Sequence, residues 1–226
     1  MNISEHNKKV AISRWEKKHA KEKSMIRNDV QALLLKASLC GFLAGDGSVQ
    51  KRKEKNNFHY QLDFFPDNCL TRDTYIKQIK AVYKKAPSVR KKNNFYAVRL
   101  ASKIVVEDIT EIASFGVKKW SPPEILFSIG GAKENWLKAF FSCEAYVNSK
   151  SIKIQTVNQA GILRIAQMLK EMGIGSTYFE YQPKKVNHSK VFMLFINRRD
   201  DRLKFLNKIG FWHSKKTRIL SEALDL

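Results

Sequence analysis

The sequence of 226 residues is poor in acidic side chains, and it lacks any long hydrophobic run. It holds 21 Asp and Glu against 42 Lys and Arg, which gives a formal net charge of +21. An imbalance of this size indicates a polyanionic partner, and nucleic acid bound through its phosphates fits best. No apolar stretch is long enough to span a bilayer, and we recognise no signal peptide, so we expect no membrane partner.

Cysteine is also scarce. The three thiols are Cys40, Cys69 and Cys143, and no two of them form a CxxC pair. Such usage is typical of small, buried residues in a reducing compartment. The five histidines fit no zinc-finger spacing, and neither a Walker-type phosphate loop nor a Ser/His/Asp order is present. We therefore expect an intracellular protein without a zinc site, in a prokaryotic cytoplasm or an organelle matrix.

What the chain does contain is one short motif that occurs twice. Residues 39–47 read LCGFLAGDG, and residues 137–145 read LKAFFSCEA. Each is an apolar run with small residues four apart, and each closes with one acid, Asp46 or Glu144. An unpaired carboxylate at the end of a buried helix is costly. Two such acids on two matching helices suit a two-metal site that cleaves phosphodiesters.

The elements that follow each motif repeat as well. In the first half, periodicity predicts strands over 58–65 and 94–100 and helices over 70–83 and 103–114. The second half has the same order. Strands are predicted over 151–156, 176–181 and 190–197, and helices over 160–172, 200–208 and 217–226. Asp46 and Glu144 lie 98 positions apart, and a period this long indicates a duplicated domain.

These patterns divide the chain into a basic N-terminal arm over 1–28, a first half-domain over 29–116, a linker over 117–133 and a second half-domain over 134–226. Pro122 and Pro123 stiffen the linker. The arm has few apolar anchors, and we expect either a loose helix or a solvated tail. Its basic residues are Lys8, Lys9, Arg14, Lys17, Lys18, Lys21, Lys23 and Arg27.

Small residues in the two motifs predict how the halves meet. Gly41 and Gly45 share one helical face, and Ala139 and Cys143 hold the equivalent positions in the second motif. Small residues at i and i+4 let two helix backbones approach closely. We therefore expect the two helices to pack side by side, with the two acids together at their C-terminal ends. Bound divalent cations would relieve the repulsion between these carboxylates.

This pattern resembles the LAGLIDADG family of homing endonucleases in its single-chain, two-motif form, over about residues 29–226. The resemblance is strong at residues 41–47, whereas Ala139 and Ala145 replace the usual glycines of the second motif. We expect Ala145 to fit less easily, because that glycine usually lets the chain turn into the next strand. The resemblance implies an α+β fold of two pseudo-two-fold related αββαββα units, whose saddle-shaped antiparallel sheets lie in the DNA major groove.

The same resemblance implies the roles of individual residues. Asp46 and Glu144 are expected to be catalytic and to bind Mg²⁺, for which Mn²⁺ would substitute. Gly45 and Cys143, which precede the acids, belong to the implied metal sites. Gln155 matches a family glutamine, whereas Pro66 and Asp67 stand at about that place in the first half. A basic residue is expected near each acid, and each half offers a pair: Lys118 or Lys119, and Lys215 or Lys216.

A sheet in a groove should alternate, with apolar side chains toward its helices and polar ones toward the DNA. The polar residues that follow this alternation are the predicted DNA-binding set: Gln50, Arg52, His59, Gln61, Asp63, Arg90, Lys92, Arg99, Lys153, Gln155, Tyr178, Glu180 and Gln182. Arg and Gln suit guanine and adenine edges, while lysines hold phosphates. Residues 191–196 do not alternate, and we expect them to be buried on both faces.

Three functions follow as alternatives. The first is a monomeric, site-specific endonuclease that cuts a long asymmetric double-stranded DNA site across the minor groove. The second is a catalytically weak or inactive relative that binds intron RNA as a maturase or DNA as a regulator. The third is a different metal enzyme that uses Asp46 on a glycine-rich turn. For the endonuclease, the unequal motifs predict unequal cutting rates on the two strands.

Overall fold

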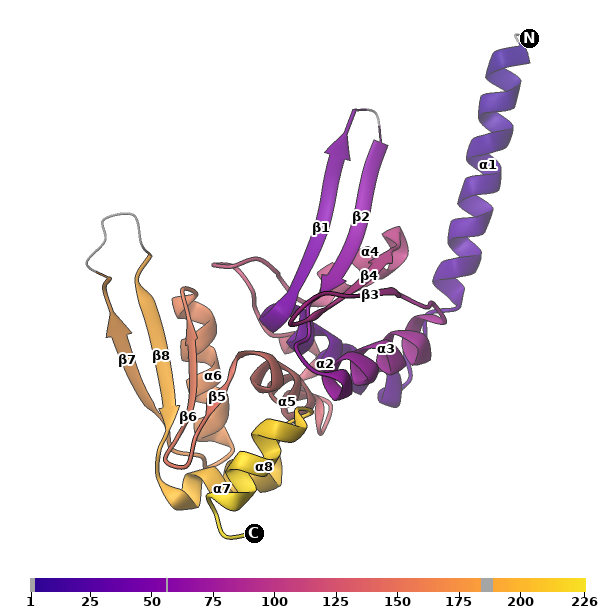
Figure 1. Cartoon of the computed structure of the whole chain (residues 1–226). Coiled ribbons are helices and arrows are strands. Elements are labelled where there is room, and N and C mark those ends of the chain that lie inside the picture. The colour runs from indigo at the N-terminus through magenta and orange to yellow at the C-terminus, as the bar shows by residue number, and fades with distance from the viewer. Residues whose placement is uncertain (1–2, 56, 184–188) are drawn as a thin grey trace.

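Two four-stranded sheets flank a central pair of helices in the computed structural model of the chain (Figure 1). The structure describes residues 3–55, 57–183 and 189–226. The side chains of residues 3–9, 11 and 12, Lys8 and Lys9 among them, lie outside that description. No helix of the described part is long and apolar enough to cross a membrane.

The first half follows a long N-terminal helix, α1 (Ile3–Ser24). Its elements are α2 (Val30–Asp46), β1 (Gly47–Glu54), β2 (Asn57–Phe64), α3 (Cys69–Tyr83), β3 (Ser88–Lys91), β4 (Tyr96–Ala101) and α4 (Lys103–Ile112). A short 3-10 turn, η1 (Glu124–Leu126), lies in the segment that leads to the second half. The second half comprises α5 (Ala132–Glu144), β5 (Tyr146–Val147), β6 (Ile152–Thr156), α6 (Gln159–Glu171), β7 (Thr177–Tyr181), β8 (Val191–Ile196), α7 (Arg199–Lys208) and α8 (Ser214–Glu222).

The duplication predicted from the motifs is confirmed by the sheet topology. Both sheets are antiparallel, with the orders β1-β2-β4-β3 and β5-β6-β8-β7, so each strand has a counterpart in the other half. The helix that follows the second strand begins in the same way in both halves. Asn68 and Asn158 are its N-caps, and their side chains accept from the amides of Thr71 and Gly161.

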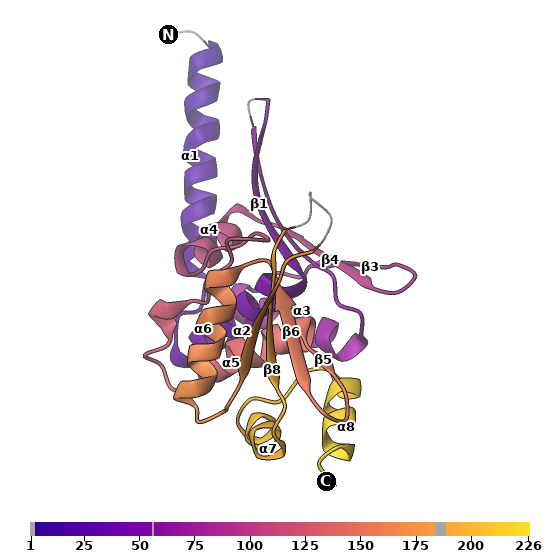
Figure 2. The same ribbon diagram turned by 90° about the vertical axis from the view of Figure 1, so that its left-hand side faces the viewer.

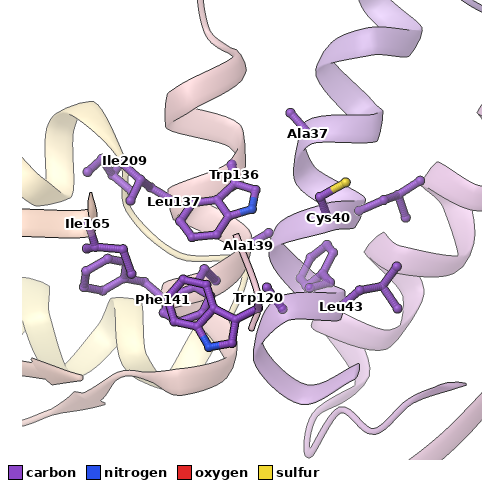
Figure 3. Close-up of a cluster of buried hydrophobic side chains, with 14 of the residues drawn as sticks. Ala37, Cys40, Leu43, Trp120, Trp136, Leu137, Ala139, Phe141, Ile165 and Ile209 are labelled. Carbon is purple, nitrogen blue, oxygen red and sulfur yellow. The ribbon is translucent and has the colours of Figure 1, made fainter. Parts of the chain in front are cut away.

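The core is centred on α2 and α5 (Figure 3). Trp136 stacks on Phe140 within α5, and Trp120, from the segment between the halves, packs against both rings. On the other side, Phe42 of α2 contacts Phe64. Because both halves share one core, the two helices hold the two sheets in a fixed relation to each other.

The arm predicted over residues 1–28 contains a helix of 22 residues. Helix α1 projects to the same side of the molecule as the β1–β2 hairpin (Figures 1 and 2). It is tied at its C-terminal end, where Lys85 Nζ lies 3.0 Å from Glu22 Oε2. Further along, Lys103 Nζ lies 4.6 Å from the centre of the Trp15 ring. A helix fastened near one end presents most of its basic side chains to solvent.

Two smaller expectations are wrong. Cys40 is buried and Cys143 is partly buried, but Cys69 is exposed, with its sulfur 3.2 Å from the Tyr96 hydroxyl. Strand β8 does alternate: Phe192, Leu194 and Ile196 are buried, while the residues between them are only partly covered. The all-apolar run therefore has one face in the core and an apolar opposite face.

Candidate active site

The site begins at the crossing of α2 and α5, where the four small residues of the motifs meet. A Cβ added to Gly41 would lie 2.3 Å from the Trp136 carbonyl oxygen and 2.9 Å from Ala139 Cβ. A Cβ added to Gly45 would lie 2.6 Å from Cys143 Cβ. The backbones are so close that a side chain on α2 has no room at either position. This approach brings the C-terminal ends of the two helices together.

The turns that leave the two helices differ from our expectation for Ala145. Gly47 and Ala145 are the C-caps, with φ values of −112° and −75°, so neither turn needs the left-handed region. Gly47 is constrained by space instead, because a Cβ there would lie 2.4 Å from Leu43 Cα. Ala145 occupies ordinary extended backbone and fits without strain.

Asp46 and Glu144 are the last residues of α2 and α5, and both are partly buried. A Cβ on Gly45 would lie 3.6 Å from Glu144 Cγ, so the second acid lies against the chain that carries the first. Burial raises the pKa of Asp46, against the opposing field of Lys216. Burial and then the Asp46 charge raise the pKa of Glu144 to about 7. Two carboxylates held this way favour a proton or a cation between them.

Of the second lysine pair, Lys216 reaches the site and Lys215 does not. Lys216 Nζ donates to the carbonyl oxygens of Ser142 and Cys143, at 2.7 and 2.8 Å, just before Glu144. Burial lowers the pKa of this ammonium, while the nearby Cys143, Asp67 and acids oppose the shift. Lys215 is exposed. The spacing in the sequence left this choice open, because it does not show which side of the α8 first turn faces α5.

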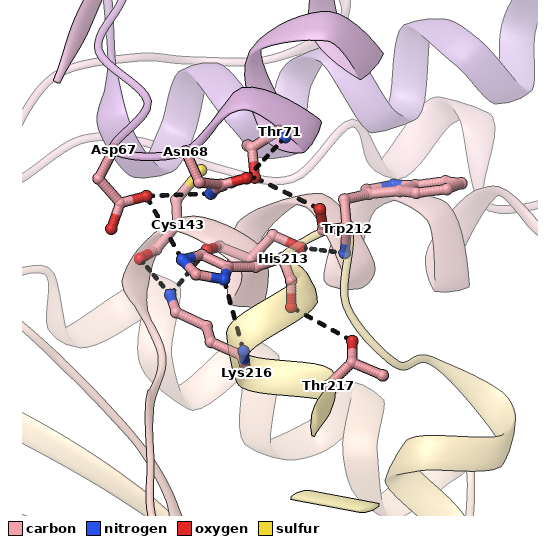
Figure 4. A network of polar contacts seen from close by, with 9 residues as sticks. Asp67, Asn68, Thr71, Cys143, Trp212, His213, Lys216 and Thr217 are labelled. Atoms are coloured by element: carbon pink, nitrogen blue, oxygen red, sulfur yellow. Dashed lines mark hydrogen bonds and ion pairs between the residues drawn. The ribbon is translucent and has the colours of Figure 1, made fainter. Parts of the chain in front are cut away.

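A polar network that the sequence did not predict connects the two halves (Figure 4). Its members Asp67, His213 and Lys216 act on the pKa of Asp46. His213 caps α8, and its Nε2 lies 3.4 Å from Asp67 Oδ1. The His213 hydrogen bond, followed by the Asn68 amide and Lys216, holds the pKa of Asp67 below its usual range. Asp67 also places a carboxylate near Asp46, and its charge contributes to the raised pKa of Asp46. The available signal was its position at the end of the first-half strand, where the family glutamine was expected.

Glu144 lies in an open cleft of about 460 Å³ between the two halves. Ser48 and Val49 line it from β1, and Gln155 from β6. The turn at Gly116 and Val117 forms another part of the wall. The first lysine pair, Lys118 and Lys119, follows this turn and is exposed. The two acids thus share Lys216 but otherwise have different neighbours: Asp67 and His213 near Asp46, and Gln155 with the turn at Gly116 near Glu144.

The donor set suits a hard divalent cation that other groups help to bind. Carboxylate oxygens are the ligands that Mg²⁺ prefers, and it commonly uses one or two of them together with phosphate and water. Within the described residues, no three His, Cys, Asp or Glu side chains are grouped to hold a metal on their own. The carbonyl of Cys143, one of the implied metal-site residues, already accepts from Lys216. Asp46 and Glu144 therefore fit a cation whose remaining ligands come from substrate and solvent.

The outer face of the first sheet, away from its helices, carries the predicted polar residues. The register places Gln50 opposite Gln61 and Arg52 opposite His59, so these four side chains share that face. The same register extends the polar face across β4 and β3 to Asp63, Arg90, Lys92 and Arg99. Asp63 is only 4 % exposed and accepts from Arg99 at 2.7 Å. It therefore orients the arginine instead of presenting its own oxygens.

The second sheet differs from the prediction. Lys153 and Gln155 do lie on the outer face, opposite Phe195 and Met193. Tyr178 and Glu180 do not: their strand partners are the buried Leu194 and Phe192. The Tyr178 ring stacks on Phe192, and Gln159 of α6 donates to Glu180 at 3.2 Å. Gln182 follows the end of β7. Alternation in the sequence gives the period of a strand, but it does not show which of the two alternating sets of side chains faces the helices.

Comparison with known proteins agrees with this architecture. Residues 132–210 match the family model described as a LAGLIDADG-like domain. No curated protein sequence matches the chain.

Similar solved structures include the homing endonuclease I-DmoI in complex with DNA and Mn, with 20% identity and a TM-score of 0.63 over 79% of this chain and 97% of that one. I-WcaI bound to its DNA recognition sequence has 15% identity and a TM-score of 0.56, over 83% and 86% of the two chains. Full-length DUF199/WhiA from Thermotoga maritima has 14% identity and a TM-score of 0.58, over 92% of this chain and 65% of that one. At these identities the structures establish the fold.

The family match to the second half and the duplicated αββαββα fold of the whole agree with the two acid-ended motif helices at its centre. Residues 132–210 therefore match the LAGLIDADG-like domain, and the chain as a whole shares the fold of the homing endonucleases I-DmoI and I-WcaI.

Proposed function

We propose that this protein is a divalent-metal-dependent endonuclease that cleaves a long double-stranded DNA site. The observation that carries the proposal is the meeting of Asp46 and Glu144 at the ends of two packed helices, beside a cleft that both halves line. Because one chain supplies both acids, a monomer suffices for cutting both strands. I-DmoI and I-WcaI, which share the fold, are described in complex with DNA.

The chain's residues have distinct parts in this proposal. Asp46 and Glu144 supply carboxylate oxygens for the cations, whose binding relieves the cost of two buried negative charges. A bound Mg²⁺ or Mn²⁺ supplies water activation and stabilisation of the leaving oxygen. Lys216 adds a positive charge near both acids, and it orders the end of α5 through two carbonyls. Gln155, and the lysine pair after Gly116, would face the phosphate beside Glu144.

Binding rests on the polar face of the first sheet and on net charge. Arg52, Arg90 and Arg99 are exposed on that face, and arginine is the usual partner of guanine in the major groove. The formal charge of +21 provides phosphate neutralisation over a long site. Many modest contacts of this type would define the site together.

The test begins with selection of bound duplexes from a randomised library without Mg²⁺, followed by addition of Mg²⁺. Wild-type protein should cut both strands of the selected duplex. Asp46→Asn and Glu144→Gln should lose at least about a hundredfold in rate and retain binding, because each substitution removes a carboxylate that holds the cation. Asp200→Asn, an exposed acid on α7, is the matched control and should cut normally.

The same experiment separates the alternatives. If both acid variants still cut, the active-site assignment is wrong. If wild-type protein binds a selected duplex but nicks neither strand, the chain is a DNA-binding regulator. Retention of an intron RNA in place of any duplex would identify a maturase. The second candidate thus differs from the first in its ligand or in the absence of cleavage.

A further inference from the structure

The outer faces of the two sheets have opposite chemistry, although the sheets are counterparts in the fold. On the first sheet, cross-strand partners are polar, such as Gln50 with Gln61. On the second sheet, Tyr146 lies opposite Lys153, Phe179 opposite Met193 and Tyr181 opposite Val191. We call this second surface the apolar face, made of Tyr146, Phe179, Tyr181, Val191, Met193 and Phe195. Phe179, Tyr181 and Tyr146 are 51, 53 and 63% exposed.

The rings of the apolar face are already arranged against one another. Phe179 and Phe195 meet edge to face, with centroids 5.6 Å apart. The Lys153 ammonium lies 5.9 Å from the centre of the Phe195 ring. Stacking of an unpaired base needs a free, flat ring face, and Phe195 has Phe179 and Lys153 against it. The aromatic and aliphatic groups of this face suit van der Waals contact with small apolar groups.

A second copy of the chain is a poor occupant for this face, because a net charge of +21 on each molecule opposes association. Double-stranded DNA fits better. The apolar face holds the place in the second half that the polar face holds in the first, and Gln155 of the same sheet lines the cleft with Glu144. A duplex that lies along the first sheet and across the cleft therefore also contacts the second sheet.

The apolar feature of the DNA major groove is the C5-methyl group of thymine. We propose that the apolar face reads thymine methyl groups, so that the half-site under the second sheet is thymine-rich and recognised by hydrophobic contact, whereas the first sheet reads its half-site by hydrogen bonds. This inference rests on the proposed function and adds the basis of specificity in one half-site. Gln155 is a polar residue of the same face that lines the cleft, and Lys153 lies two positions before it on β6.

The test uses the duplex selected from a randomised library, with each thymine replaced in turn by deoxyuridine. This change removes one methyl group and leaves base pairing intact. Burial of one methyl-sized group predicts an increase in Kd of about fourfold for each contacted thymine. In one half-site several thymines should show this loss. In the other half-site, deoxyuridine should change Kd by less than about 1.5-fold.

Protein variants assign the effect to the apolar face. Phe179→Ala and Tyr181→Ala remove exposed side chains, so both should fold, which a thermal melt would verify. In these variants the fold increase in Kd that deoxyuridine causes in the sensitive half-site (the deoxyuridine penalty) should fall toward one. Arg90→Ala, on the first sheet, is the control and should weaken binding while leaving the penalty intact.

Three results would overturn the inference while leaving the endonuclease proposal standing: a selected duplex without thymine in either half-site, deoxyuridine without effect throughout, or a penalty that persists in both aromatic variants. Failure of the proposed function is seen separately, as the absence of any selected duplex or of its cleavage when Mg²⁺ is added. Preference for single-stranded RNA at that step would instead indicate that the aromatic rings contact bases.

Discussion

At the scale of single residues, the helix crossing makes a compensating pair testable. A Cβ at position 45 would lie 2.6 Å from Cys143 Cβ. We expect Gly45→Ala to lower the free energy of unfolding by about 1–3 kcal/mol through overpacking. Adding Cys143→Gly should recover much of the lost stability, since it removes the Cβ atom that the new methyl group would clash with. Urea unfolding of both single variants and the double variant gives the coupling energy.

Cys143→Ala provides the control for that cycle, because it keeps the Cβ and removes only the sulfur. It should rescue Gly45→Ala far less than Cys143→Gly does. Equal rescue by both would mean that the sulfur, and not the backbone approach, limits the packing of the two helices.

The carboxyl group of Glu144 gives a pH dependence whose sign is defined. Its pKa rises from 4.5 to about 7 in the folded protein, through burial and the nearby Asp46. Between these values the folded state binds more protons than the unfolded one, so this group makes stability fall as pH rises. We expect the loss to extend from about pH 4.5 to about pH 7 in metal-free buffer, measured by urea unfolding in EDTA.

Glu144→Gln should remove that component, so the difference in stability between wild type and variant should shrink or reverse as pH rises across the window. Glu144→Asp keeps a carboxyl group at the site and should keep the fall. Parallel pH profiles for wild type and Glu144→Gln would show that the side chain titrates normally.

At the scale of elements, helix α1 is expected to contact DNA beyond the sheets. It projects on the same side as the β1–β2 hairpin (Figure 1), and Arg14 and Lys17 on it are exposed. Replacing both by Gln should weaken binding and reduce the slope of log K against log salt by up to about two, because each phosphate contact releases a counterion. Affinity measured over a series of salt concentrations provides the readout.

The paired substitution Lys77→Gln and Lys80→Gln, on exposed positions of α3, removes the same charge from a different helix. Its salt slope should stay closer to that of wild type. If the two double variants behave alike, only net charge matters and α1 has no direct contact.

The elements also show where sequence reasoning succeeds and where it stops. Strand and helix positions followed from local periodicity, which is why β2, α3 and β6 lie within a residue or two of their predicted bounds. The orientation of β7 did not. Whether Tyr178 or Phe179 faces the helices depends on its register with β8, a contact between distant segments. The Asp67–His213 pair was missed for the same reason, since its members come from opposite halves of the chain.

At the scale of the whole molecule, two equivalent halves carry two unequal sites. The unequal motifs predicted unequal strand cutting because alanine replaces both glycines of the second motif, yet Ala145 has ordinary extended backbone. The structure supplies a different reason. Both acids lie near Lys216, but Asp46 also lies near Asp67 and His213, whereas Glu144 faces an open cleft with Gln155. Charges around the two scissile phosphates would therefore differ, and so would the stabilisation of their transition states.

We therefore expect the strand nearer Asp46 and the strand nearer Glu144 to be cut at different rates. A supercoiled plasmid that carries the selected site should pass through an accumulating nicked form, and end-labelled duplexes would show which strand is cut first. Lys216→Met should change the ratio of the two rates, because Lys216 opposes the raised pKa of both acids but only Asp46 has His213 as a further opposing group. Lys215→Met removes the same charge from an exposed neighbour and should leave the ratio unchanged. Equal rates on both strands, in wild type and in Lys216→Met, would mean that the groups around the acids do not influence the cleavage step.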